Sequence, residues 1–446
     1  LCRRCMRACS ELQGIGCLTI AGQGEYAHIA TFGDNKQGAS VCIECGQCVV
    51  HCPTGALTER DQTAEVWKAI EDPTKHVVIQ TAPSPRAAMG ECFGLEPGTP
   101  LTFEMNTAMK KMGFDAVFDT NFSADLTIME EGTELLQRLY QTQVMRDPKV
   151  RLPLLTSCSP GWVKYIEYFY PELLEHLSTA KSPQQMFGAI IKTYYAQIKG
   201  LDPQNIVSVS LMPCTAKKFE CNRPEMNASG FKDVDYALTT RELAKMMKEY
   251  GLDLPKLPKT GFDDPFGEPS GSGVIFGATG GVMEAALRTV IELVSGKKVE
   301  DFYTHADIVP VRGFEGIRIA EIPVKDIGPV PELLQHLFTD FEWLKGVTLR
   351  VAVAHGAANL KKVMDDIKSH GFFSTCHFIE MMACPGGCLG GGGQPIPTSQ
   401  EIRAKRAKAI YGEDANYVIR KSHENPQVLQ IYREFLLEGP CGHKAH

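Results

Sequence analysis

Three cysteine motifs lie far apart in the sequence, and each directly follows a short apolar or β-branched run. The motifs are TSCSPGW (156–162), MPCTAKKFE (212–220) and ACPGGCLGGGGQP (383–395). Converging thiolates are the ligands that a soft metal or an iron–sulfur cluster requires, whereas a structural cysteine needs only a place in the core. We therefore expect four or five thiolates from these motifs to meet at one metal centre.

The runs before the motifs have the length and composition of buried strands. They cover residues 152–156, 206–212 and 377–383, and runs of four to seven such residues are typical of strands inside α/β proteins. In parallel α/β sheets, sites collect in the crevice outside the carboxyl ends of the strands. The cysteines stand at these ends.

Residues 1–60 contain two further cysteine groups with the spacing of bacterial ferredoxins. The second group is a full C-x2-C-x2-C-x3-C-P run, in which the fourth cysteine serves the other cluster; the first has the same spacings without its first cysteine. One [4Fe–4S] cluster is expected on Cys42, Cys45, Cys48 and Cys9, and a second on Cys2, Cys5, Cys52 and a cysteine upstream of Leu1. Zinc is the alternative, although zinc sites more often show two separated pairs.

The two ends of the chain suggest a longer protein. Leu1 stands inside a cysteine motif and the sequence stops at GPCGHKAH (439–446), so we expect further sequence on both sides. Cys17 belongs to neither cysteine group, and we interpret it as a small core residue.

Composition limits the classes of function. The 446 residues are 43% apolar and 22% charged, enough for two or three domains with substantial cores. The net charge of −7 argues against non-specific binding of nucleic acid, and no run of eighteen apolar residues predicts a membrane span. The clustering of the sixteen cysteines favours metal sites over disulfides. We therefore expect the protein to work in a reducing compartment.

Beyond a polar helical connector at 58–76, strands and helices alternate. Strands are predicted at 77–82 and 115–120 and helices around 101–112 and 124–141. This alternation favours parallel sheets covered by helices. The polar stretch 256–273 is predicted to be a long loop over the site, and the glycines that follow it are predicted to allow close helix packing, because their spacing does not fit a nucleotide-binding loop.

In order and spacing, the three motifs resemble the signature motifs of the [FeFe] hydrogenases. Further similar stretches are 81–91, 127–138, 177–188, 239–247 and 275–288. The resemblance implies a ferredoxin-like α+β domain over residues 1–60 and an α/β catalytic domain over residues 61–446. The catalytic domain would have two lobes, parallel and mixed sheets, and the cluster between the lobes.

This resemblance also implies reversible interconversion of protons, electrons and molecular hydrogen. The site would be a [4Fe–4S] cluster joined through a cysteine sulfur to a two-iron centre with carbon monoxide, cyanide and a bridging dithiolate. Cys214, Cys384 and Cys388 match cluster ligands, with Cys388 as the bridge, and Lys217 matches a lysine that hydrogen-bonds a cyanide. The residues that match the lining of the two-iron centre are Ala82, Pro83, Ser84, Met212 and Met382.

One position departs from the family pattern TSCCPxW, in which the first cysteine carries protons and the second is a cluster ligand. Here the second position is Ser159. Either the backbone shifts so that Cys158 becomes the ligand and Ser159 or water carries protons, or Ser159 ligates through its oxygen, a poorer match for a soft cluster site. We favour the first account, because it keeps four thiolates.

The family's proton path matches two carboxylates on one predicted helix and two further residues. Glu131 and Glu134 are three residues apart and share a helix face. Ser178 and Arg138 complete the path by motif position. Without the resemblance, the two carboxylates would be interpreted as a solvated helix face.

Three other functions share part of this cysteine pattern. A hydrogen-sensing relative would keep the cluster but alter the proton path, and Ser159 leaves room for it. An iron–sulfur assembly protein would lack Lys217 and the glycine-rich motif, while a cysteine hydrolase would need a paired histidine. The expected electron partners are ferredoxin or NAD-linked subunits, and the expected location is the cytoplasm.

Overall fold

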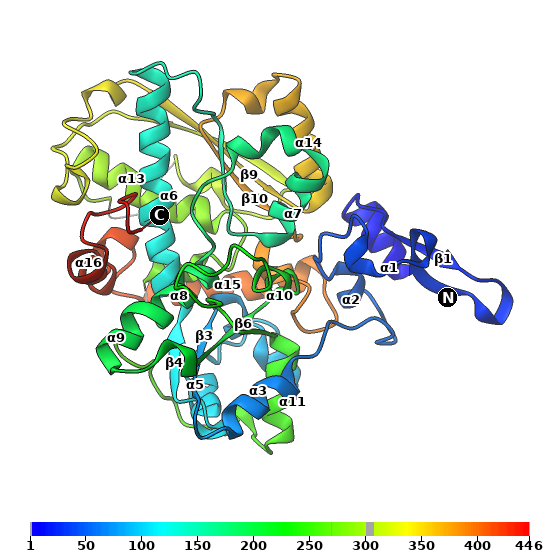
Figure 1. Ribbon diagram of the computed structural model, residues 1–446. Helices are drawn as coiled ribbons and strands as arrows, with labels where there is room; N and C mark the ends of the chain where they lie inside the picture. Colours follow the sequence, from blue (N-terminus) through cyan, green and yellow to red (C-terminus); the bar gives the residue numbers. More distant parts are fainter. Residues whose placement is uncertain (1, 269, 300–306, 446) are drawn as a thin grey trace.

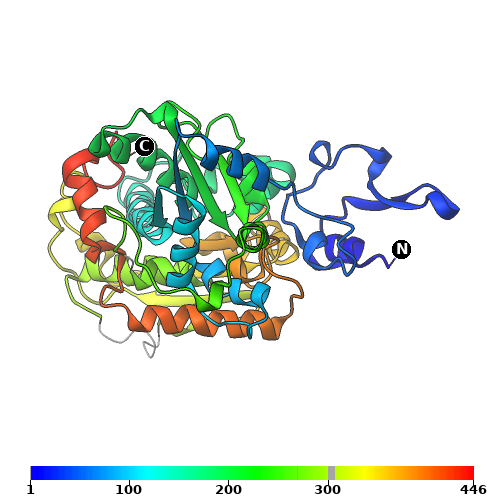
Figure 2. The ribbon, with the colours of Figure 1, turned by 90° about the horizontal axis from the view of Figure 1, so that it is seen from below.

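The computed structural model describes residues 2–268, 270–299 and 307–445. In two perpendicular views, the N-terminal cysteine-rich segment projects from one side of a larger body (Figure 1, Figure 2). The segment contains one antiparallel hairpin, formed by β1 (Leu18–Ala21) and β2 (His28–Thr31). Two short helices, α1 (Arg4–Arg7) and α2 (Gln47–Val50), carry Cys5 and Cys48.

The first sheet of the body is entirely parallel. Its order is β4-β3-β6-β7, with bounds β3 His76–Thr81, β4 Ala116–Asp119, β6 Ile206–Met212 and β7 Tyr236–Thr239. Alternate side chains face opposite ways, so Val77 packs beneath α3 (Thr63–Glu71), α5 (Thr102–Met112) and α11 (Thr240–Glu249), while Val78 packs on the other face. Both faces are therefore buried, as a parallel sheet requires.

The second sheet is mixed. Its order is β5-β10-β9-β8, with β8 antiparallel to β9, and its bounds are β5 Leu154–Leu155, β8 Ile317–Pro323, β9 Thr348–His355 and β10 Phe378–Met382. Helices α7 (Pro160–Phe169) and α14 (Ala357–Lys368) cover one face. Helix α13 (Gly281–Ser295) covers the other.

Each sheet with its covering helices forms one lobe of the body, and helix α6 (Thr120–Gln143) runs alongside both (Figure 1). The Asp119 carboxylate caps its first turn by accepting from Asn121 N–H at 2.8 Å. Phe122 and Met129 pack with the first sheet, whereas Ile128 and Leu135 pack with the second. The remaining helices are α4 Pro83–Arg86, α8 Pro183–Ile190, α9 Ala196–Lys199, α10 Ala216–Glu220, α12 Gly271–Ile275, α15 Gln400–Asn416 and α16 Pro426–Ile431.

The glycines after residue 270 allow close packing, as predicted. A Cβ on Gly273 would lie 2.6 Å from Asn121 Cβ, and one on Gly277 would lie 2.9 Å from Ser84 Oγ. The prediction that 256–273 covers the site was wrong for its described part, which runs along β4: Asp263 N–H donates to Val117 O at 2.9 Å. Phe266 is buried there, because it completes an aromatic cluster of the first lobe.

Candidate active site

A cavity opens where β5, β6 and β10 end, and residues from both lobes line it. Its volume is about 90 Å³, several times the roughly 10–15 Å³ that one water needs. Four cysteines line it, one or two from each motif: Cys158, Cys214, Cys384 and Cys388. The structure thus brings the three motifs together.

Turns of defined geometry aim the cysteines at the cavity. Cys214 directly follows β6 and leads into α10. Cys388 lies in a helical turn over Gly387–Gly390, and Gly387 has a φ of +73°. A Cβ on Gly387 would lie 2.8 Å from the backbone N of Thr279, so both the backbone conformation and the close approach require glycine there.

The clustered thiols disfavour their own ionisation. Burial, followed by the neighbouring Cys214, raises the pKa of Cys388 to about 12. Burial and the nearby Cys214 also raise the pKa of Cys384. A bound metal centre removes this repulsion, because it supplies positive charge to sulfur ligands.

Lys217 is a buried cation at the cavity wall. Its Nζ donates to Glu220 Oε2 at 2.9 Å and to Cys158 O at 3.1 Å. Burial alone lowers the pKa of Lys217, but the Glu220 carboxylate outweighs it and the net pKa is raised. The ammonium therefore stays charged and can hold an anionic group in the cavity.

The other predicted lining residues also face this cavity. Met212 and Met382, at the ends of β6 and β10, contribute thioethers to the wall. Ala82, Pro83 and Ser84 follow β3 and complete the wall. The Ser84 hydroxyl donates to Gly277 O at 3.1 Å, so it is already engaged with the backbone of the second lobe.

Cys158 and Ser159 present their side chains to different neighbours. Ser159 Oγ accepts from Ala383 N–H at 3.3 Å, next to Cys384. The pKa of the Cys158 thiol is raised, first by burial and then by the Glu131 charge. The hydroxyl thus lies against the third motif, and the thiol interacts electrostatically with the carboxylate of α6.

A chain of polar groups leads from this carboxylate outward. Among the described residues, no group lies in full hydrogen-bonding geometry with either buried oxygen of Glu131, although Ser178 and the Ser157 backbone are near enough to lower its pKa. Ser178 Oγ donates to Glu134 Oε2 at 2.7 Å, and Arg138 pairs with Glu134 Oε1 at 2.7 Å. Burial, with the Glu134 charge, raises the pKa of Glu131 to about 8. A group with such a pKa can both bind and release a proton near neutral pH.

A second cavity, of about 320 Å³, lies in the N-terminal segment. Its lining includes Cys9, Cys42, Cys45 and Cys48, the four residues predicted to hold one cluster. Cys17 lines it too, with its Sγ 3.5 Å from Cys9 Sγ. The hydrogen bonds that Cys17 shares with Cys42 and Cys9 raise the pKa of its thiol.

The three cysteines predicted to hold the other cluster also lie near one another. The pKa of Cys5 is raised, mainly by burial and to a lesser degree by Cys52 and Cys2. Cys2 is exposed, whereas Cys5 and Cys52 are buried.

Short contacts join the two cavities. Gln47 Nε2 donates to Gly390 O at 2.8 Å, and Gln13 Nε2 donates to Ala383 O at 2.8 Å. Cys384 Sγ lies 3.9 Å from Cys45 O. A thiol of one cavity thus contacts the backbone of a cysteine that lines the other.

Most of the chain, including all three cysteine motifs, matches one protein family. Residues 75–392 match the model described as "Iron only hydrogenase large subunit, C-terminal domain". The chain belongs to the iron-only hydrogenase family. Residues 400–446 match "Iron hydrogenase small subunit", and residues 39–58 match "4Fe-4S binding domain".

Named hydrogenases resemble the chain over nearly its full length. It is 46% identical to the NADP-reducing hydrogenase subunit HndD of Solidesulfovibrio fructosivorans, over 100% of this chain and 72% of that protein. It is 41% identical to iron hydrogenase 1 of Clostridium pasteurianum, over 98% of this chain and 71% of that protein. A solved [FeFe]-hydrogenase HydA1 from Chlamydomonas reinhardtii aligns with a TM-score of 0.73 and 39% identity, over 87% of this chain and 97% of that one. The hydrogenase chain is therefore an enzyme, an iron–sulfur oxidoreductase.

Relatives of lower sequence identity are named as iron–sulfur assembly proteins. The cytosolic iron-sulfur assembly component 3 of Pongo abelii is 30% identical over 95% of this chain and 86% of that protein. None of the helices in the described ranges is long and apolar enough to cross a membrane.

Two residues near the cavities of this hydrogenase were missed by sequence reasoning. Glu220, three residues after Lys217 on α10, anchors the lysine, and helical spacing would have indicated this pairing. Cys17 has no motif around it. Only the fold shows that it meets Cys9.

Proposed function

We propose that the chain catalyses the reversible combination of two protons and two electrons into molecular hydrogen. The observation that carries this proposal is one cavity that combines clustered cysteines, the buried ammonium of Lys217 and a nearby unpaired carboxylate, Glu131. When bound, a [4Fe–4S] cluster joined to a two-iron centre supplies the redox-active metal at which the H–H bond forms or breaks.

Cys214, Cys384 and Cys388 are the proposed cluster ligands, with Cys388 as the bridge to the two-iron centre. The fit rests on sulfur donors that are crowded together and on the shared apolar wall of Met212 and Met382. Lys217 holds the anionic side of the centre, because its charge is fixed by Glu220. Ala82, Pro83 and Ser84 exclude water on the opposite lobe.

At the fourth corner we propose Ser159, with Cys158 as the proton carrier. The hydrogen bond from Ala383 N–H holds the Ser159 oxygen beside Cys384. Cys158 instead interacts with Glu131. This arrangement reverses our preference from the sequence, because it requires no shift of the backbone.

Protons are proposed to move between Cys158 and the surface through the side chains described above. Glu131 exchanges a proton with the Cys158 thiol, and Ser178 links Glu131 to Glu134. Arg138 holds Glu134 in place and is partly exposed. Each member is a donor or an acceptor of the kind that a proton relay needs.

Electrons are proposed to enter through two [4Fe–4S] clusters in a domain over residues 1–60, ahead of a catalytic domain over 61–446. The contacts of Gln13 and Gln47 with the third motif support a fixed short path. The electron donors are proposed to be ferredoxin or NAD-linked subunits in the cytoplasm. The likeness to an NADP-reducing hydrogenase subunit supports such a partner.

Infrared spectroscopy and hydrogen assays on the matured chain test this function. Iron-bound carbonyl and cyanide bands together with hydrogen evolution from a reduced viologen dye are expected. Iron–sulfur clusters without these bands after maturation would contradict the proposal. Replacing Cys388 by serine should remove both the bands and the activity.

A second candidate is an iron–sulfur assembly function, favoured by the similarity to assembly proteins over 95% of the chain. Such a protein would bind [4Fe–4S] clusters and pass them on without hydrogen turnover. A hydrogen sensor is the third candidate. It would bind the same cofactor, but its rate of hydrogen turnover would be very low. The proton chain from Cys158 to Arg138 argues for turnover.

A further inference from the structure

We propose that the Cys17 thiol donates a hydrogen bond to the Cys9 sulfur, a ligand of the N-terminal cluster nearest the catalytic cavity, and raises the reduction potential of that cluster. This inference rests on the cluster assignment to Cys9, Cys42, Cys45 and Cys48, and goes beyond it by adding a fifth cysteine that is not a ligand. Cys17 acts through other residues, so it is a positioning residue.

The first support is the position of the thiol. Cys17 is 8% exposed and lines the same cavity as the four proposed ligands. Its Sγ lies 3.5 Å from Cys9 Sγ, within the range of a hydrogen bond to sulfur. The thiol thus reaches one of the proposed ligands of the cluster.

The second support is the way in which the loop before Cys17 is held. Ile15 N–H donates to Cys9 O at 2.9 Å, and Gly14 and Gly16 take φ values of +66° and +68°. Gln13 ties the start of this loop to Ala383 in the catalytic lobe. These contacts fix the backbone before Cys17, so its thiol is held beside Cys9.

Charge explains the direction of the effect. A cluster gains one negative charge on reduction, and its sulfur ligands then accept hydrogen bonds more strongly. A donor placed at the ligands stabilises the reduced form more than the oxidised form. Gln37 Nε2 and Glu44 N–H already approach Cys42 Sγ, at 3.2 and 3.4 Å, and Cys17 adds a donor on the side of Cys9.

An EPR-monitored redox titration of the full iron–sulfur-loaded chain tests the proposal, with the relevant signal identified by its loss in Cys48→Ala. Cys17→Ala is expected to lower the midpoint potential. At a fixed potential the reduced-to-oxidised ratio should fall by up to about tenfold, which equals about 59 mV for one electron. Cys17→Ser keeps a donor and should fall between the two.

Cys376→Ala is the matched control, since Cys376 is also a buried cysteine but lies in the core of the second lobe. It should leave the potential unchanged. A cluster of unchanged potential in Cys17→Ala would overturn the proposal. So would loss of one cluster's iron in Cys17→Ala and Cys17→Ser, because Cys17 would then be a ligand. The readout needs no hydrogen turnover, so failure of the hydrogenase function leaves this test intact.

Discussion

Substitutions at positions 158 and 159 separate the two accounts of the fourth cluster corner. With Cys158 as the proton carrier, Cys158→Ala should keep the iron content and lower hydrogen evolution by about 10²- to 10⁴-fold. Ser159→Cys should keep iron and change the EPR spectrum of the catalytic cluster, because a thiolate replaces an oxygen. Loss of iron in Cys158→Ala would instead make Cys158 the ligand.

Glu131 gives the proton path a pH dependence. Its pKa is raised to about 8, chiefly by burial, so the carboxyl is protonated below that value and can deliver a proton. Hydrogen evolution should fall as the pH rises through about 8. Glu131→Gln should lower evolution by at least about 10²-fold and remove this step.

Glu91→Gln is a control for the glutamate exchange, since Glu91 pairs with Arg406 outside the proton path. It should leave the pH step in place. A step near pH 8 that persists in Glu131→Gln would assign the titration to another group.

Some residues of the site could be predicted from the sequence, and others could not. The strand runs before the three motifs predicted that their cysteines meet, whereas the lining residues Ala82, Pro83, Ser84, Met212 and Met382 were predicted from the resemblance to the family. The contact between Cys17 and Cys9 depends on the path of a glycine-containing loop. No periodicity or spacing encodes that path, so the contact could not be predicted.

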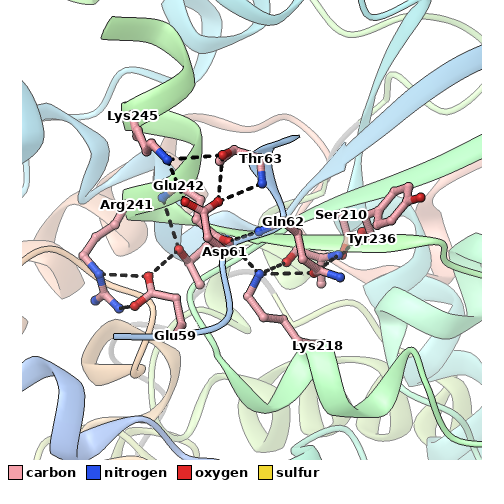
Figure 3. A network of polar contacts seen from close by, with 12 residues as sticks. Glu59, Asp61, Gln62, Thr63, Ser210, Lys218, Tyr236, Arg241, Glu242 and Lys245 are labelled. Carbon is pink, nitrogen blue, oxygen red and sulfur yellow. Dashed lines mark hydrogen bonds and ion pairs between the residues drawn. The ribbon is translucent and has the colours of Figure 1, made fainter. Parts of the chain in front are cut away.

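At the scale of elements, a buried ion pair fastens the connector after the N-terminal segment to α10 and α11. Lys218 Nζ donates to Glu242 Oε1 at 2.8 Å and to Gln62 Oε1 at 3.2 Å, and the close-up shows these groups turned toward one another (Figure 3). Glu242 also completes the capping box of α11 with Thr239. Lys218 is therefore a joint between three segments.

Lys218→Met should lower the free energy of unfolding by about 3–5 kcal/mol, because it leaves a buried carboxylate unpaired. The measurement is chemical denaturation of the chain. Lys245→Met is the control: Lys245 pairs with Asp61 at the surface, so its loss should cost at most about 1 kcal/mol. Equal losses in the two variants would contradict this role for burial.

A substitution of Gly273 tests the close contact of α12 with α6, and a substitution of Gly412 is its control. Gly273→Ala should destabilise the chain by about 1–3 kcal/mol, because its Cβ would overlap Asn121. Gly412→Ala, in α15 with open space around it, should instead stabilise the chain by about 0.5–1 kcal/mol. Denaturation curves compare them, and a stable Gly273→Ala would contradict the tight contact.

Several elements were predicted from the sequence with nearly correct bounds. The strand predicted at 206–212 is β6, and the helix predicted at 101–112 is α5, one residue shorter. An apolar, β-branched run indicates β6 because both faces of that strand are buried. The course of 256–273 was mispredicted, since its polar composition gave no sign that Phe266 completes an aromatic core.

For the molecule as a whole, the projecting N-terminal segment predicts two separable units. A chain that begins at residue 61 should fold and, after maturation, evolve hydrogen with a reduced viologen dye. It should lose the iron of both N-terminal clusters. Iron analysis and circular dichroism check this, and aggregation of the shortened chain would show that the body cannot do without Ile43, which packs in the core of the second lobe.

Helix α6 has a consequence for the cooperativity of unfolding. It contributes Phe122 to one core and Leu135 to the other, so melting of either lobe removes packing from the other. The two lobes are therefore expected to unfold in a single transition, with the same midpoint for a probe in either lobe.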